Sequence, residues 1–139
     1  MHEWAIAMSV IQTMEKWAKE KGVNIMKVVV SLPSLSMLDL DIMRDAFKIL
    51  KKNTVLENSE FEVRVRDTDF DCRNCGRRFS LEEIKRQLSE VFENYGEENP
   101  LHLLPAFVSS FARCPFCGSH DFTSELSVLV DGIDYESDA

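Results

Sequence analysis

Four cysteines make up the pattern in this sequence that is most directly suited to chemistry. They occur as two Cys-x-x-Cys pairs, Cys72 with Cys75 and Cys114 with Cys117, and a glycine follows each pair. Two intervening residues let the backbone fold back so that both sulfurs face one point, and the glycine permits a turn with positive φ. Two such pairs supply four thiolates in tetrahedral geometry, which predicts one structural zinc ion.

The spacing of the two pairs leaves alternatives open. The 38 residues between Cys75 and Cys114 exceed the roughly 15–20 of a compact zinc ribbon, although the entropy of loop closure grows only slowly with length. Two redox dithiols or two disulfides are the alternatives, but two equivalent pairs favour zinc. His120 is an alternative ligand, although four cysteines already close a structural site. A dry shell is expected from four aromatic residues, Phe70, Phe79, Phe116 and Phe122.

The first three residues, Met1, His2 and Glu3, offer a second set of donors. A large residue at position 2 normally protects Met1 from removal, so we expect a free amine, two adjacent backbone nitrogens and the imidazole of His2. Together they can form five- and six-membered chelate rings. Ionised peptide nitrogens favour a square plane, which points to Ni(II) or Cu(II). The alternative is that these residues are simply the frayed start of a helix.

Apolar periodicity predicts alternating helices and strands before the cysteines. The pattern indicates an amphipathic helix over 3–21 stopped by Gly22, a strand over 25–32, a helix over 38–51 and a strand over 60–66. The strand over 25–32 is expected to end at Pro33.

A second group of elements is predicted in and after the cysteine region. Ser80 and Glu83 form a capping box that begins a helix through about Phe92, and residues 96–100 interrupt it. A short helix is expected over 105–112. Finally, apolar alternation indicates a strand, with a turn at Asp131-Gly132; the apolar positions are Leu126, Val128, Val130, Ile133 and Tyr135.

This order predicts an α+β fold with two parts. Residues 1–67 and 121–139 would form a small helix-on-sheet domain, and residues 68–120 would form an inserted, zinc-ribbon-like domain that carries a helical insert. The strand over 123–135 is expected to return and pair with the strand at 60–66 or the strand at 25–32, because its alternating apolar residues need a buried face.

Composition and charge narrow the class of function. The chain has 139 residues, is 45% hydrophobic and carries a formal net charge of -8, which fits a folded globular protein and argues against binding to nucleic-acid phosphates. We expect no membrane segment and no secretory signal, and hence a cytoplasmic location. Neither a phosphate-binding Gly-x-x-x-x-Gly-Lys loop nor a Ser-His-Asp or Cys-His nucleophile arrangement is evident, so an enzyme is not expected.

The sequence resembles the HypA family over essentially its whole length. The resemblance rests on the start Met1-His2-Glu3-Trp4-Ala5, on the predicted order of helix, strand and helix, and on the two cysteine pairs, the second of which continues as Gly118-Ser119. HypA proteins act in nickel incorporation during the maturation of nickel–iron hydrogenase. The chain departs from the family at Leu32-Pro33-Ser34-Leu35, where the family usually has Gly-x-Leu, and its insert between the cysteine pairs is longer than in most members.

The resemblance implies a metallochaperone with two metals. His2 matches the family's nickel-binding histidine, and Glu3 matches the neighbour whose backbone nitrogen takes part; His102 resembles a histidine that some long-insert archaeal members add to the nickel site. The four cysteines match the structural zinc ligands, whereas Ni(II) would be transient cargo. The implied partners are a HypB-type nucleotide-hydrolysing maturation protein and the large subunit of the hydrogenase. The alternative is a zinc-ribbon interaction or regulatory module without a nickel role.

Overall fold

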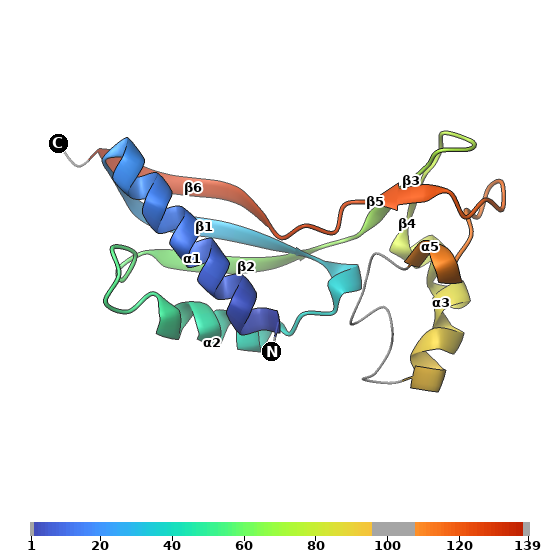
Figure 1. Ribbon diagram of the computed structural model, residues 1–139, viewed down its shortest axis with the longest axis horizontal. Coiled ribbons are helices and arrows are strands. Elements are labelled where there is room, and N and C mark those ends of the chain that lie inside the picture. Colours follow the sequence, from blue (N-terminus) through green and yellow to red (C-terminus); the bar gives the residue numbers. More distant parts are fainter. Residues whose placement is uncertain (1, 96–107, 138–139) are drawn as a thin grey trace. The chain divides into compact units, whose positions relative to one another are not determined.

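The computed structural model describes residues 2–95 and 108–137, and the chain divides into two compact units. The first unit contains residues 1–32, 38–65 and 128–139, and the second contains residues 33–37 and 66–127. Figure 1 shows the elements of both units, with colours that follow the sequence. No helix among the described residues is long and apolar enough to cross a membrane.

The first unit has two helices packed on one face of a three-stranded sheet. Its elements are α1 (His2–Lys21), β1 (Val23–Pro33), α2 (Leu40–Leu50), β2 (Glu60–Arg66) and β6 (Leu129–Ser137). The strand order is β2-β1-β6, and β6 runs antiparallel to β1. The α1–β1–α2–β2 order agrees with the sequence prediction, and Gly22 ends α1 with a φ of 63°.

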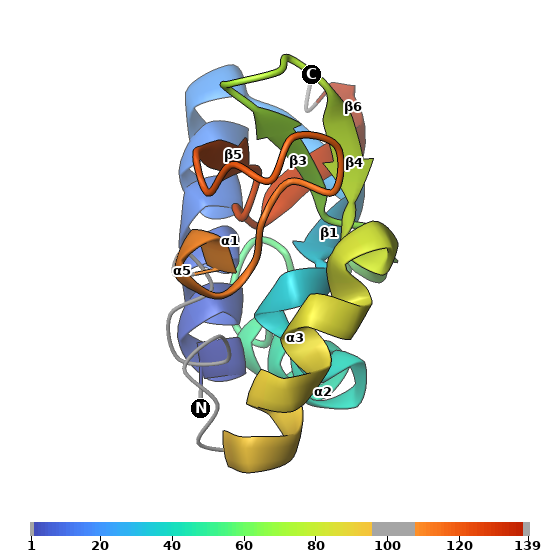
Figure 2. The ribbon, with the colours of Figure 1, turned by 90° about the vertical axis from the view of Figure 1, so that its right-hand side faces the viewer.

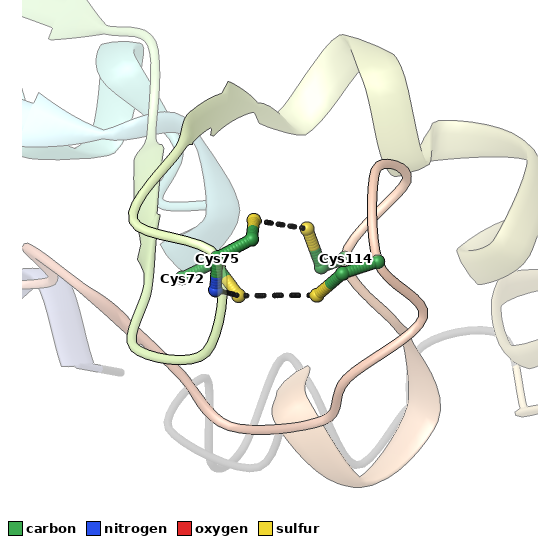
Figure 3. A group of neighbouring side chains, drawn as sticks. Cys72, Cys75 and Cys114 are labelled. Atoms are coloured by element: carbon green, nitrogen blue, oxygen red, sulfur yellow. Dashed lines mark hydrogen bonds between the residues drawn. The ribbon is translucent and has the colours of Figure 1, made fainter.

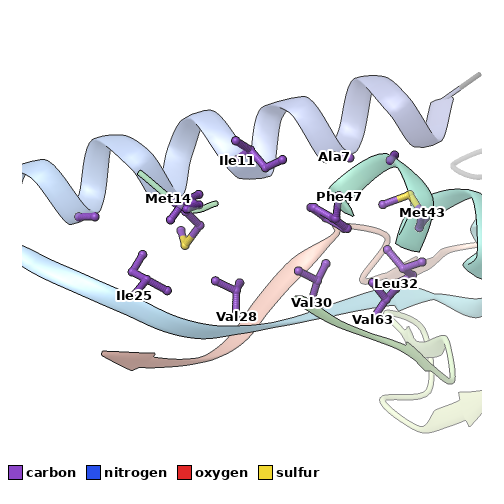
Figure 4. Close-up of a cluster of buried hydrophobic side chains, with 13 residues drawn as sticks. Ala7, Ile11, Met14, Ile25, Val28, Val30, Leu32, Met43, Phe47 and Val63 are labelled. Atoms are coloured by element: carbon purple, nitrogen blue, oxygen red, sulfur yellow. The ribbon is translucent and has the colours of Figure 1, made fainter. Parts of the chain in front are cut away.

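The core of the first unit lies between the helices and the sheet (Figure 4). The buried residues of α1 recur at helical spacing, and those of β1 alternate along part of the strand, so that each element contributes one apolar face. The ring of Phe47 on α2 stacks on that of Phe61 on β2, with centroids 4.7 Å apart. The fully or nearly fully buried members include Ala7, Ile11, Met14, Val28, Val30, Leu32, Met43 and Phe47.

The second unit is built around a smaller three-stranded sheet. It contains η1 (Ser34–Ser36), β3 (Asp69–Cys72), β4 (Arg78–Ser80), α3 (Leu81–Tyr95), α5 (Val108–Phe111) and β5 (Phe122–Ser124), and the strand order is β4-β3-β5. Figure 2 shows this unit facing the viewer, with α3 and α5 below the strands. Phe70, Phe79 and Phe122 pack ring against ring at its centre, with centroid separations of 5.2–5.4 Å.

The structure differs from the sequence prediction at the end of the chain. The predicted turn at Asp131-Gly132 is wrong, because β6 runs through it; the register shifts there, and Asp131 is the extra residue of a bulge opposite Val29 and Val30. The single strand predicted over 123–135 is two strands, of which β5 pairs with β3 and β6 pairs with β1.

The boundaries between the units also differ from the predicted ones. Residues 121–127 lie in the second unit rather than the first, because β5 completes its sheet and Leu126 packs against its core. Residues 33–37 lie in the second unit as well, because the side chain of Leu35 is buried there. Periodicity within each segment carries no information about these long-range contacts.

Candidate metal centre

The two cysteine pairs converge on one point in the second unit. Cys72 is the last residue of β3, and Cys75 lies on the turn that leads to β4. Cys114 and Cys117 lie on the matching turn between α5 and β5. Figure 3 shows the labelled Cys72 and Cys75 on one turn, facing Cys114 on the other. The sequence prediction placed these four residues together, and the fold brings them together.

The sulfur positions fit a tetrahedral zinc ion. All four sulfur atoms lie within 4.8 Å of one another. The Sγ atoms of Cys72 and Cys117 are 3.5 Å apart, and those of Cys75 and Cys114 are 3.8 Å apart. A Zn–S bond of about 2.3 Å in tetrahedral geometry requires sulfurs about 3.8 Å apart, whereas a disulfide needs about 2.05 Å. The four cysteines are free thiols, so the donor set and its dimensions match zinc and not disulfides.

Both turns use the same set of hydrogen bonds to aim their thiols. In the first, the N–H of Cys72 donates to the carbonyl of Arg77 and the N–H of Gly76 donates to the carbonyl of Cys72. In the second, the N–H of Cys114 donates to the carbonyl of Ser119, and the N–H of Gly118 donates to the carbonyl of Cys114. Gly76 and Gly118 have φ values of 75° and 78°, as predicted.

Further N–H groups point at the sulfurs themselves. The backbone N–H of Cys75 donates to the Sγ of Cys72 at 3.4 Å, and the N–H of Phe116 donates to the Sγ of Cys114 at 3.4 Å. In addition, the side-chain amide of Asn74 donates across to the Sγ of Cys117 at 3.5 Å. Each such bond favours the thiolate, which is the form that binds a metal.

The thiols of the cluster differ in acidity. The hydrogen bond from Asn74, followed by one from the backbone of Ser119, lowers the pKa of Cys117 to about 6. The backbone of Arg77 acts in the same direction on Cys75, but burial and the neighbouring sulfurs outweigh it and raise the pKa of Cys75 to about 11. Four adjacent thiolates repel one another, so the fully ionised cluster requires a cation such as zinc.

Two residues near the cluster do not have the roles that their positions suggested. The Nδ1 atom of His120 lies 2.9 Å from the carbonyl oxygens of Ser109 and Ala112, to which its N–H donates, and His120 is not part of the metal-sized cluster among the described residues. Phe116, expected in a dry shell, is 47% exposed, and the guanidinium of Arg77 lies 4.9 Å from the centre of its ring.

The predicted nickel donors lie at the start of the first unit. His2 is the first residue of α1 and is exposed, whereas Glu3 is 6% exposed. Burial would raise the pKa of Glu3, but the charge of the amino terminus and hydrogen bonds from the backbones of Glu3 and Asp39 hold it below its usual value. Met1 and His102, the other two predicted donors, lie outside the described residues.

Sequence reasoning did not identify the structural role of Asn74 or the burial of Glu3. Asn74 lies between the two cysteines of its pair. An amide side chain at that position is the signal that could have indicated a hydrogen bond to a cysteine sulfur. The buried carboxylate of Glu3 accepts a hydrogen bond from the backbone of Asp39, the N-cap of α2, and no local pattern reports a contact of this range.

The family model described as "HypA: Hydrogenase/urease nickel incorporation, metallochaperone" matches residues 1–129. Relatives with the name hydrogenase maturation factor HypA include that of Thermococcus sibiricus, which is 32% identical and is matched over 99% of both chains. The relative from Pyrococcus furiosus is 34% identical over 99% of this chain and 98% of its own. These identities extend over nearly complete chains.

Solved structures agree with the fold. The solution structure of the Ni metallochaperone HypA from Helicobacter pylori has a TM-score of 0.63 at 16% identity and covers 97% of each chain. A second solution structure of a HypA protein has a TM-score of 0.62 at 19% identity, over 99% of this chain and 98% of its own. With the family model matched over most of the sequence, the chain belongs to the HypA family.

Proposed function

We propose that this chain is a nickel metallochaperone that binds one Ni(II) ion at the start of α1 and holds one structural Zn(II) ion in its cysteine cluster. The observation that carries the proposal is the match to a family described by nickel incorporation. The matched region begins at residue 1 and so includes His2. The family is one of metallochaperones, and no catalytic step is assigned to this chain.

The nickel donors are the imidazole of His2, the backbone nitrogens of His2 and Glu3, the amine of Met1, and His102. The first residues of a helix have no intrahelical carbonyl to receive their N–H groups, so coordination through these nitrogens breaks no helical hydrogen bond. At Glu3 it replaces the hydrogen bond from the backbone N–H to the residue's own carboxylate. The carboxylate of Glu3 is buried while His2 is exposed. This arrangement supports a fixed backbone that presents one imidazole to solvent.

The zinc ion is structural because its four cysteines leave no open coordination position. Metal binding at such a site contributes directly to folding, since the second unit surrounds the cluster with only a small apolar core. Cys72, Cys75, Cys114 and Cys117 would therefore hold the second unit together, while Ni(II) is cargo that the first unit accepts and releases.

The nickel would be delivered in the cytoplasm to the large subunit of a nickel–iron hydrogenase. The names of the relatives, hydrogenase maturation factors, favour hydrogenase over urease as the recipient. A HypB-type nucleotide-hydrolysing maturation protein would act with the chain and supply the energy-dependent step. Nucleic acid and membranes are not proposed as partners.

Nickel titration of the protein with its native amino terminus tests the proposal. Calorimetry should detect one tightly bound Ni(II) per chain, and the absorption spectrum should show square-planar or near-planar nitrogen coordination. His2→Ala should lower the affinity at least about tenfold, because it removes the imidazole donor at the start of α1. Zinc content should stay at one per chain.

The matched control is Gln12→Ala, which changes an exposed residue of the same helix and should leave nickel binding unchanged. An extra residue before Met1 should weaken binding if the amine is a ligand. Equal nickel binding by the wild type and His2→Ala would overturn the proposal and leave the alternative, a zinc-ribbon module without a nickel role.

A further inference from the structure

The strand β6 lies at one edge of the sheet in the first unit, because the strand order is β2-β1-β6 (Figure 1). On its inner side β6 pairs with β1, and on its outer side no strand of the described part of the chain pairs with it. The backbone N–H and C=O groups of that outer side are therefore available to a strand from another molecule. Adding a strand to a free sheet edge is a common mode of peptide recognition.

An apolar groove lies between α1 and the beginning of β6, on the helix side of the sheet. It has a volume of about 430 Å³, and its walls include residues spaced by four along α1, Ala5, Ser9 and Thr13, together with Val128 and Val130. The hydroxyl of Thr13 donates to the carbonyl of Ser9 at 2.8 Å, so this polar group needs no partner from outside. Because β6 is the last strand of the sheet, a side chain from an added strand can enter the groove.

The side chains of β6 alternate between an apolar face and an acidic face. On the helix side, Ile133 packs against the core, and the ring of Tyr135 meets that of Trp17 on α1 edge to face, with centroids 5.4 Å apart. Asp134 and Glu136, which occupy the alternate positions, belong to the opposite face of the sheet and are exposed. A strand beside β6 places its own side chains on the same two faces, so apolar residues fit on the helix side and basic residues on the other.

The charge of β6 is not balanced within the sheet. Residues 129–137 contain three acidic residues and no lysine or arginine. Lys27 of β1 lies opposite Asp134, but its ammonium is 3.4 Å from the carboxylate of Glu62 on β2, and among the described residues neither Asp134 nor Glu136 forms an ion pair. A second copy of the chain would place one acidic face beside another, which is unfavourable. A basic segment is complementary to this strand.

We infer that α1 and β6 form a docking surface for an extended, basic segment of a partner protein, which joins the sheet as a strand beside β6. Its backbone forms hydrogen bonds with the outer side of β6, and its apolar side chains enter the groove beside Val130 and cover Tyr135. Its lysine or arginine side chains pair with Asp134 and Glu136 on the opposite face. The described metal donors are not among the residues that line the groove, so the inference goes beyond the proposed function and does not depend on either metal.

Titration of a fluorescent probe peptide with the full chain tests the inference. The probe has nine residues, as β6 does, and alternates valine with lysine. Fluorescence anisotropy should show saturable binding, at least about tenfold tighter than for the same peptide with glutamate in place of lysine. Methylation of the probe's backbone nitrogens removes its N–H donors without changing its charge, and should also weaken binding at least about tenfold. Amide hydrogen exchange along the outer side of β6 should slow when the probe binds.

Two variants of the chain test the groove and the acidic face separately. Ser9→Trp fills the groove without changing the charge and should weaken binding at least about tenfold; its matched control is Gln12→Trp, which adds the same bulk at an exposed position of α1 outside the groove. The double variant Asp134→Asn with Glu136→Gln should weaken binding by a similar factor. Its control is Asp45→Asn with Glu57→Gln, which removes the same charge from exposed positions elsewhere in the first unit and should have little effect.

Three outcomes would overturn the inference. Equal binding of the lysine probe and its methylated form would show that the net charge of -8 attracts the peptide without strand pairing, and this comparison needs no variant of the chain. Undiminished binding by Ser9→Trp would exclude the groove. A dimer in sedimentation that protects the outer amides of β6 and excludes the probe would assign the edge to a second copy. None of these results bears on nickel binding at His2.

Discussion

At the scale of single residues, the hydrogen bond from Asn74 distinguishes one thiol from the other three. It joins a side chain on the first cysteine turn to a sulfur on the second. Because an amide N–H stabilises a thiolate and not a thiol, the hydrogen bond from Asn74 lowers the pKa of Cys117, to about 6. Outer donors of this kind commonly tune metal affinity.

We expect Asn74→Asp to weaken zinc binding by about tenfold. The aspartate has nearly the same shape, but it donates no hydrogen bond and places a negative charge beside the thiolate. The pKa of Cys117 should therefore rise above 6. Zinc must then displace a proton that wild-type Cys117 has already lost at neutral pH, so the variant should lose zinc at a higher pH as the solution is acidified.

Competition with a chromogenic chelator across a pH series measures this effect. Arg73→Gln is the control on the same turn, because it removes only the exposed ion pair between Arg73 and Asp121, which should contribute little. Identical pH profiles for zinc loss in the wild type and Asn74→Asp would show that the bond to Cys117 does not affect the metal.

At the scale of elements, α3 shows how far local sequence determines structure. The capping box predicted from Ser80 and Glu83 is present: the N–H of Ser80 donates to the carboxylate of Glu83 at 2.9 Å, and the N–H of Glu83 donates to the hydroxyl of Ser80 at 3.3 Å. Both of these capping hydrogen bonds join residues three apart in sequence, so a short-range pattern can report them.

We expect Ser80→Ala to lower the free energy of unfolding of the second unit by about 1 kcal/mol, because the N–H of Glu83 loses its acceptor. Ser89→Ala is the matched control on the same helix. The hydroxyl of Ser89 donates back to the carbonyl of Arg86 within the helix, so alanine should be neutral or slightly stabilising there. Chemical denaturation of the zinc-loaded protein, followed by hydrogen exchange in α3, should show this difference; equal losses would contradict the capping role.

Features that depend on contacts between residues far apart in the sequence could not be predicted from local patterns. The position of Leu35 in the second unit depends on Thr68, which lies 33 residues away, and its own neighbours indicate only a loop. β5 has three residues and is defined by its pairing with β3. By contrast, the cysteine pairs and the helices could be predicted because their signals repeat within a few residues.

At the scale of the whole molecule, the chain passes between the units four times. Residues 33–37 leave the first unit and return to it, and residues 66–127 form a second, longer excursion. The sheet of the first unit is closed by β6, which follows this excursion and pairs with β1 along most of its length. The first unit therefore depends on both ends of the described chain.

We expect a chain that stops after Ser127 to lose the first unit but keep the second. Without β6, the backbone of β1 lacks its antiparallel partner, and the core loses the partly buried Ile133 and Val128. Hydrogen exchange at Val28 and its neighbours should rise toward unfolded values, whereas zinc content should remain at one per chain. Protection of β1 at wild-type levels in this truncated chain would show that β6 is dispensable.

The late position of β6 also has a consequence for the order of events during biosynthesis. Chains emerge from the ribosome from their amino-terminal end, and segments fold as their partners become available. β1 emerges early but must wait for β6, which is translated only after every cysteine. The four cysteines can therefore come together on the nascent chain before the first unit closes. The second unit can then take up its metal during translation, before the unit that carries His2 is complete.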